Sequence, residues 1–244
     1  MDRSKASTHG LSAQDTGSDS TTDGLRSRKK ARRREEILEH ARTLFGERGV
    51  DATTMAEIAE AAGVSTPTVF NYFGNKDGIL IAIIAEGAQN ARENSKVLEP
   101  RTDVPFLTTL MTVFMDVSVE TMAIASKRIW RYANAAAMRH PTTDLATSFR
   151  NVDDALLDII EIILAPYELT LKDGSHGDPR VIANLFFDVW MQMFNRFLTR
   201  AEMSIETHRD ELEHRFAPLC GMIFAPAFLE TPGLRTPAPN GKRS

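Results

Sequence analysis

The sequence predicts an all-α protein in which a three-helix helix-turn-helix domain precedes a larger helical domain. Apolar residues recur at three- and four-residue spacing along most of the chain, and runs that alternate with period two are scarce. The 244 residues, of which 42% are hydrophobic and 25% charged, have the composition of an ordinary globular protein. Start and stop signals divide the chain into about nine helices with almost no strand.

Both ends of the chain are predicted to be disordered tails. Residues 1–25 are rich in Ser, Thr, Asp and Gly, and they contain too few large apolar side chains to offset the entropy of ordering. Residues 231–244 combine prolines with glycines. Between the tails we expect a first domain at residues 26–80 and a second at residues 81–230.

The first domain opens with a helix and a capping signal. Residues 32–48 present one apolar face, and Gly49 ends this helix. Thr54 and Glu57 then have the form of a capping box, in which the threonine hydroxyl accepts the glutamate amide and the carboxylate reaches back. A short second helix is predicted to begin there.

A turn joins this helix to a third one. Gly63 suits the left-handed backbone conformation that ends a helix. Ser65 or Thr66 can cap a third helix that extends to Phe73, and Pro67 is tolerated in its first turn. Two short helices joined by a glycine-containing turn form a helix-turn-helix.

The later helices follow from the same signals. Asn75 is expected to cap a fourth helix, residues 76–97, in which Gly78 costs about 1 kcal/mol of helix stability. Further helices are predicted at residues 105–122, 126–139, 142–165, 179–201 and 205–224.

The third helix has an outward face that is almost free of charge. Val69 and Phe73 point to the core, whereas small hydroxyls and an amide point outward and suit the edges of bases. The hydroxyl of Tyr72 can reach a phosphate. The candidate DNA-binding residues of the domain are Arg32, Arg33, Arg34, Thr54, Ser65, Thr66, Pro67, Thr68, Asn71, Tyr72 and Lys76.

Positive charge gathers in residues 26–34, although the formal net charge of the chain is −4. A local basic patch on an otherwise acidic protein indicates contact with a polyanion at one end. As an arm, it could lie along phosphates or reach the minor groove, and it would make binding strongly salt dependent. The alternatives to such an arm are a solvated terminal charge cluster and a targeting signal. The alternative to the helix-turn-helix itself is a small α-helical bundle that never meets DNA.

Four strings of residues occur together in this domain. They are Thr54-Met55-Ala56-Glu57-Ile58-Ala59, Gly63-Val64-Ser65, Val69-Phe70-Asn71-Tyr72-Phe73 and Asn75-Lys76. At this spacing, residues 34–84 resemble the TetR family of bacterial regulators.

This resemblance implies that the third helix enters the major groove and that Thr54 and Lys76 contact phosphates. At the positions that contact DNA in the family lie Thr66, Thr68, Asn71 and Tyr72. Phe70 departs from the family, which often has Tyr there, so no phosphate contact through a hydroxyl is expected at this position.

The resemblance also implies a helical effector-binding domain and a homodimer formed by residues 179–201 and 205–224. The residues agree, because the helix at 179–201 is apolar nearly all round and must be buried on several sides. The helix at 205–224 would contribute Leu212, Phe216, Leu219, Ile223 and Phe224 to the interface. The alternative is that these side chains form the core of a single chain.

Aromatic and methionine side chains of the second domain could line a pocket together with a few polar groups. A hydrophobic or aromatic small molecule is the expected effector. The candidate ligand-binding residues are Phe114, Trp130, Asn134, Phe149, Phe187, Trp190 and Met191. A stripe of this kind is more often core, which is the alternative for most of them.

Other classes of function lack their signals. Cys220 is the single cysteine, which excludes an intramolecular disulfide framework. We find no catalytic motif, phosphate-binding loop or metal-ligand spacing, so no catalytic residue, cofactor or metal is predicted, and His208 and His214 are assigned to a solvated helix face. No membrane-spanning segment or secretory signal is expected, which favours a cytoplasmic protein.

The sequence therefore predicts a ligand-responsive transcriptional repressor that binds a palindromic operator as a dimer and is released by its effector. An activator, or a regulator controlled by a protein partner, would have the same DNA-binding residues. A helical enzyme or a small-molecule carrier is the alternative from another class.

Overall fold

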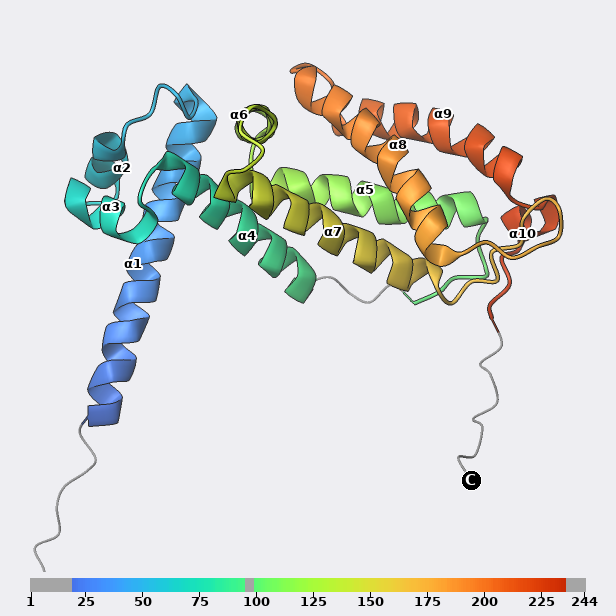
Figure 1. Cartoon of the computed structure of the whole chain (residues 1–244), viewed down its shortest axis with the longest axis horizontal. Coiled ribbons are helices and arrows are strands. Elements are labelled where there is room, and N and C mark those ends of the chain that lie inside the picture. Colours follow the sequence, from blue (N-terminus) through green and yellow to red (C-terminus); the bar gives the residue numbers. More distant parts are fainter. Residues whose placement is uncertain (1–18, 95–98, 236–244) are drawn as a thin grey trace, which may run out of the picture.

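The computed structural model describes residues 19–94 and 99–235 of the chain. Ten α-helices and no strand lie within these residues, so the predicted all-α fold is confirmed (Figure 1). The helices are α1 (Asp19–Arg48), α2 (Met55–Ala61), α3 (Thr66–Phe73), α4 (Lys76–Asn94), α5 (Phe106–Ile124), α6 (Lys127–Arg139), α7 (Asp144–Leu164), α8 (Pro179–Thr199), α9 (Ile205–Ile223) and α10 (Pro226–Glu230).

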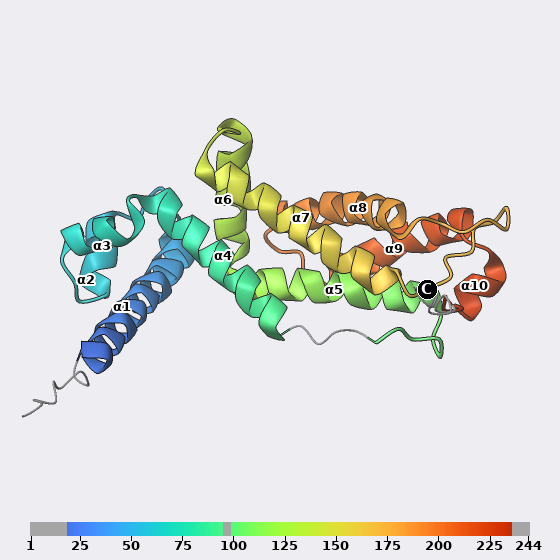
Figure 2. The same cartoon turned by 60° about the horizontal axis from the view of Figure 1, so that its bottom comes forward.

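Helices α1 to α3 form a small domain at one end of an elongated molecule, and α4 leads from it into a bundle of α5, α7, α8 and α9 (Figures 1 and 2). Within the bundle α7 packs against α4 and α8, and α5 packs against α4 and α9. Helix α6 packs against α1 as well as against α7 and α8. Two helices, α4 and α6, therefore connect the small domain to the bundle.

The turn between α2 and α3 has the predicted geometry. Gly63 adopts a φ of 63°, the left-handed conformation that its lack of a Cβ atom permits. The amide of Val64 donates to the carbonyl of Ala59 over 2.9 Å, which closes the end of α2. The two helices are thus held in the compact arrangement of a helix-turn-helix.

Close packing requires glycine at residue 78, whereas helix propensity predicted only a cost in helix stability there. The side-chain oxygen of Asn75 accepts the Gly78 amide over 2.9 Å, so the predicted cap of α4 is confirmed. A Cβ atom at residue 78 would overlap the carbonyl oxygen of Phe73, the last residue of α3. The sharp entry from α3 into α4 therefore depends on glycine at this position.

The first helix begins earlier than predicted. Helix α1 starts at Asp19 rather than near residue 32, so residues 19–25, which were assigned to a disordered tail, belong to a helix. Long basic side chains and Ala31 are good helix formers, and Arg32 pairs with Glu36 one turn later over 2.9 Å. The rest of the predicted N-terminal tail, residues 1–18, lies outside the described residues.

The other end of the chain is packed as far as residue 235, contrary to the expected tail from 231. Pro232 is buried, and the Glu168 amide donates to the Gly233 carbonyl over 2.8 Å. The Arg235 guanidinium donates to the Tyr167 carbonyl over 3.1 Å. These contacts join segments far apart in the chain, so composition could not predict them. Residues 236–244 lie outside the described residues.

The short helix α10 was not predicted from the sequence either.

Helix α5 is long and apolar enough, by length and composition alone, to cross a membrane, although no such segment was expected. In the structure it packs against α4 and α9, and Phe106, Leu110 and Phe114 are among its buried side chains. A core helix of a helical bundle meets the same criterion, since its apolar face is wide.

Candidate nucleic-acid interface and ligand cavity

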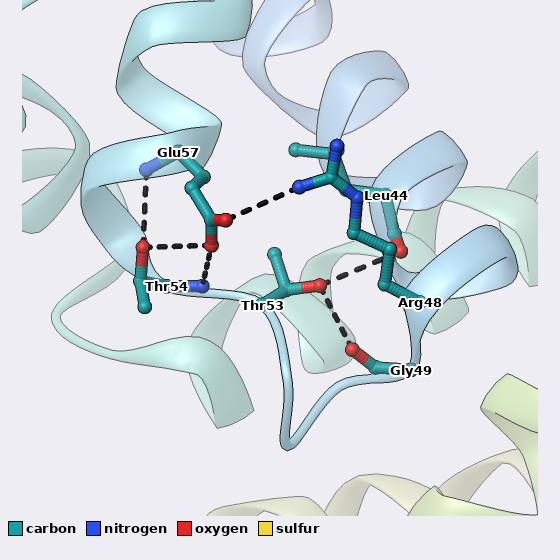
Figure 3. Close-up of polar contacts among 6 residues, drawn as sticks. All are labelled: Leu44, Arg48, Gly49, Thr53, Thr54 and Glu57. Carbon is teal, nitrogen blue, oxygen red and sulfur yellow. Dashed lines mark hydrogen bonds and ion pairs between the residues drawn. The ribbon is translucent and has the colours of Figure 1, made fainter.

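The start of α2 is held by the predicted capping box (Figure 3). The Thr54 hydroxyl accepts the Glu57 amide over 3.2 Å, and the Glu57 carboxylate accepts the Thr54 amide over 2.8 Å. The backbone hydrogen bond from Thr54 is the main reason that the pKa of Glu57 is lowered. The Thr54 hydroxyl also donates to Glu57 over 2.9 Å, so its proton is already used within the cap.

Two further contacts fix the loop before α2, and the sequence did not reveal them. Arg48, at the end of α1, donates to the Glu57 carboxylate over 3.1 Å (Figure 3). The buried Thr53 hydroxyl donates to the Gly49 carbonyl over 2.8 Å. Together they tie α2 to the end of α1, and this sets the orientation of the helix-turn-helix.

Helix α3 has no charged residue, and the outward face predicted for it is only partly exposed, because Thr66, Thr68 and Tyr72 are half-buried. Pro67, Phe70 and Asn71 are exposed, whereas Val69 is buried against the core. The hydroxyls of Ser65 and Thr68 bond to one another over 2.8 Å, and Ser65 makes no side-chain bond to the helix amides. Phe70 is 48% exposed, so the side chain that departs from the family pattern stands on the outer face.

Tyr72 lies partly inward rather than fully on this face. Its side chain is half-buried, and its hydroxyl donates weakly to the carbonyl of Lys30 over 3.4 Å. The residue therefore lies between α3 and α1. A phosphate contact through the hydroxyl would have to replace this weak bond.

The basic residues at 26–34 lie along α1 and not on an extended arm, because the helix continues through them. Arg34 forms an ion pair with Glu86 of α4, and its guanidinium lies 5.5 Å from the centre of the Phe73 ring. Arg32 pairs with Glu36, as described above. Arg33 is exposed and has no ion-pair partner within residues 19–94 and 99–235, so it is the freest cation of the three candidates.

Lys76 is engaged within the fold. Its ammonium donates to the carbonyls of Val50 and Asp51 over 2.7 and 3.2 Å. These carbonyls belong to the loop between α1 and α2, so the lysine joins the start of α4 to that loop. The phosphate contact suggested for Lys76 by resemblance would compete with these two bonds.

A cavity of about 630 Å³ lies in the second domain between α4, α5, α6, α7 and α8. Candidate residues in its lining are Trp130, Asn134, Phe149, Trp190 and Met191. Phe114 and Phe187 are outside the lining. Both are buried, and Phe114 packs edge-on against Phe216 with 5.1 Å between ring centres, so they belong to the adjoining core.

The indole nitrogens beside the cavity are already bonded to the protein. Trp130 donates to the Thr121 carbonyl over 2.9 Å, and Trp190 donates to the Ser118 hydroxyl over 2.8 Å. The side-chain amide of Asn134 donates to Asn195 over 3.4 Å. These residues therefore offer a ligand mainly aromatic surface.

Three carboxylates in the lining were missed by sequence reasoning: Asp116 and Glu120 from α5, and Asp153 from α7. Burial raises the pKa of each, and the pKa of Asp153 rises to about 6, with a smaller contribution from the nearby Asp154. A usable signal existed, because Asp116 and Glu120 are the only charged residues of α5.

His208 is also placed differently from the expectation of a solvated face. It is buried, its ring nitrogen lies 3.1 Å from the Ser118 hydroxyl, and its ring stacks on Phe197. Burial lowers the pKa of His208 to about 4, so the imidazole is neutral at physiological pH. No group of acidic, histidine and cysteine side chains that could hold a metal ion occurs in the part of the chain that the structure describes.

The fold and these two features define a helix-turn-helix DNA-binding protein with a separate cavity in its second domain. Residues 37–83 match the family described as bacterial regulatory proteins of the tetR family. The chain is 30% identical over 151 residues to the HTH-type transcriptional repressor KstR2 of Rhodococcus jostii, a match that spans 60% of this chain and 69% of that protein. The chain belongs to the TetR family of transcriptional regulators.

Two further comparisons agree. The HTH-type transcriptional repressor AcnR of Corynebacterium glutamicum is 38% identical over 60 residues, which are 25% of this chain and 32% of that protein. The structure of Salmonella enterica GusR superposes with a TM-score of 0.55 at 22% identity and covers 78% of this chain and 95% of that one. This last likeness shows the same fold.

Proposed function

We propose that the protein is a dimeric transcriptional repressor that binds a palindromic operator in the cytoplasm and leaves it when a hydrophobic or aromatic small molecule occupies the cavity. The observation that carries this proposal is that α4 and α6 each reach both sites. Helix α4 starts at Lys76 beside the recognition helix and lines the cavity with Ile84 and Ala88. Helix α6 lines the cavity with Trp130 and also contacts α1.

In the DNA complex, α3 would lie in the major groove. The exposed side chains of Pro67, Phe70 and Asn71 suit contact with base edges, since an amide can pair with adenine and an aromatic ring can contact a thymine methyl group. Thr66 and Thr68 would stand beside them. Arg33 and the rest of basic α1 would contribute phosphate contacts and most of the salt dependence.

The dimer interface is proposed on the outer sides of α8 and α9. Many of the side chains expected there, such as Phe216 and Phe224, are fully buried within one chain, so they stabilise the core instead. Apolar side chains that remain exposed on these helices are Val181 (64%), Leu185 (38%) and Met222 (65%). A second copy of the chain would cover these side chains. Dimers of this kind are typical of the family, and their two recognition helices bind two half-sites.

The two sites would be coupled through a shift of α6 and α4. A ligand that favours a different position of these helices changes the spacing of the recognition helices, and such coupling is typically about 1–3 kcal/mol. The ligand needs different affinities for the two positions, because a ligand that binds both equally shifts nothing.

Selection of the preferred operator from random duplexes, at a stated salt concentration, tests the first half of the proposal. A palindromic consensus with two half-sites is expected, bound by two copies of the chain. Titration of the complex with small molecules tests the second half. If compounds that demonstrably bind the cavity leave operator affinity unchanged, the release mechanism is wrong.

A further inference from the structure

Among the residues whose side chains are described, the cavity is lined by carboxylates but by no Lys, Arg or His. We propose that its ligand is an organic cation, an amine or quaternary ammonium group joined to an apolar or aromatic body. This inference rests on the proposed function, because it names the chemical class of the effector.

The charges come from two walls of the cavity. Asp116 and Glu120 are four residues apart on α5 and so share one face of the helix, and Asp153 comes from α7. None of the three forms an ion pair with another described residue, and the charged groups that act on their pKa values are themselves acidic, Asp116 on Glu120 and Asp154 on Asp153. The part of the lining that the structure describes is thus negative and has no counter-charge.

Such an arrangement has an energetic consequence. Removing a carboxylate from water without a cationic partner is unfavourable, and the raised pKa of Asp153 reflects this. A cation that enters the cavity would supply the missing counter-charge beside the half-buried Glu120 and Asp153, where water screens the attraction less than in bulk solvent. Asp116 is exposed and would contribute less. An anionic ligand would add a like charge and be disfavoured.

The form of the cavity favours an organic cation over a metal ion. The carboxylates do not gather closely enough to form a metal site in the described residues. Aromatic rings instead stand beside them: Trp130 and Phe149 meet edge-on with 5.8 Å between ring centres, and Trp190 stacks on Phe194 at 4.9 Å. Aromatic faces attract alkylammonium groups, and both indole N–H groups already have protein partners, as described above.

The test compares three ligands of the same shape with the full-length protein in the absence of DNA. They are 4-phenylbutyl-trimethylammonium, its uncharged carbon isostere with a tert-butyl group, and 5-phenylpentanoate. Calorimetry is expected to show a dissociation constant for the cation about tenfold lower than for the uncharged isostere, and the weakest binding for the carboxylate.

Variants locate the effect. Asp153→Asn and Glu120→Gln should each reduce the preference for the cation, and the double variant should reduce it further, leaving only the contribution of Asp116. Asp144→Asn is the matched control, because it makes the same change at an exposed residue of α7 outside the lining and should keep the preference. Removal of an uncompensated carboxylate should preserve the fold, which the melting temperature of each variant checks.

Two results would overturn the inference: equal or tighter binding of the uncharged or anionic compound by the parent protein, or no binding of any of the three at millimolar concentration. These outcomes are distinct from failure of the proposed function. Operator release by a bound neutral compound would refute the cation preference and leave the repressor mechanism standing. A protein that binds the cation but no duplex DNA would refute the repressor mechanism and leave the cation preference standing.

Discussion

Arg128 of α6 donates to the backbone carbonyl of Glu47 in the last turn of α1 over 2.5 Å. A cation at this end of a helix is favoured because the last carbonyls have no intrahelical partner. Two residues further along the same helix, Trp130 lines the cavity. One short stretch of α6 therefore contacts the DNA-binding domain and also lines the cavity.

Arg128→Ala is expected to weaken communication between the two sites. The parent protein should lose operator affinity about 5–150-fold when the effector binds, whereas the variant should lose less than about fivefold. Fluorescence anisotropy of a labelled operator, with and without effector, measures this change. Arg139→Ala is the control, since Arg139 is exposed on the same helix and has no hydrogen-bond partner among the described residues. Equal effector responses of all three proteins would exclude the Arg128 contact from the coupling.

Gly78→Ala should destabilise the protein by about 1–3 kcal/mol, because the added methyl group would overlap the Phe73 carbonyl. Helix propensity alone predicts the reverse, a gain of about 1 kcal/mol. Urea unfolding of the parent and the variant decides between them. Gly221→Ala in α9 is the comparison, since nothing lies within 4 Å of its added Cβ, and it should be neutral or stabilising.

Arg33→Ala should change the salt dependence of DNA binding, whereas Lys76→Ala should change the stability of the fold. Loss of Arg33 should lower the slope of log affinity against log salt concentration by about 1 without changing stability, because it removes one phosphate contact. Loss of Lys76 should leave that slope unchanged and lower the free energy of unfolding by about 0.5–1.5 kcal/mol per lost hydrogen bond. If the Lys76 variant instead shows a reduced slope of log affinity against log salt concentration, Lys76 contacts a phosphate, as the family resemblance implies.

Asp153→Asn should raise stability near neutral pH. The pKa of Asp153 is about 6 in the folded protein and 3.8 in the reference state, so the folded protein binds the proton more tightly. Its ionisation therefore opposes folding as the pH rises from about 4 to 6, by on the order of 1–3 kcal/mol above that range. Denaturant unfolding of both proteins should show the largest difference near pH 7 and little difference below about pH 4. A constant difference would contradict this assignment.

Val181→Glu and Leu185→Glu should convert the proposed dimer into monomers, because each introduces a charge into an apolar contact between two copies. Sedimentation velocity at micromolar concentration measures the change. Val119→Glu is the matched control, since Val119 is equally apolar and 52% exposed but belongs to α5, which is not one of the two helices of the proposed interface. A dimer that persists in both α8 variants would place the interface elsewhere.

Features that depend on neighbours in the chain were predicted well. The capping box of Thr54 and Glu57, the left-handed Gly63 and the Asn75 cap each involve residues within about one helical turn, so the sequence contains all the groups that interact. Helix boundaries in the second domain followed from the same local signals. The family resemblance arose from these positions as well.

Features that depend on distant partners were decided by the tertiary structure. Composition could not show that Lys76 bonds to the loop after α1, that Phe114 belongs to the core, or that Asp153 faces the same cavity as Asp116 and Glu120. Helical periodicity identifies which side chains share a face, but the partner of that face comes from another helix. The recognition helix could therefore be predicted from its sequence alone, whereas the charge of the cavity became apparent only when five helices were packed around it.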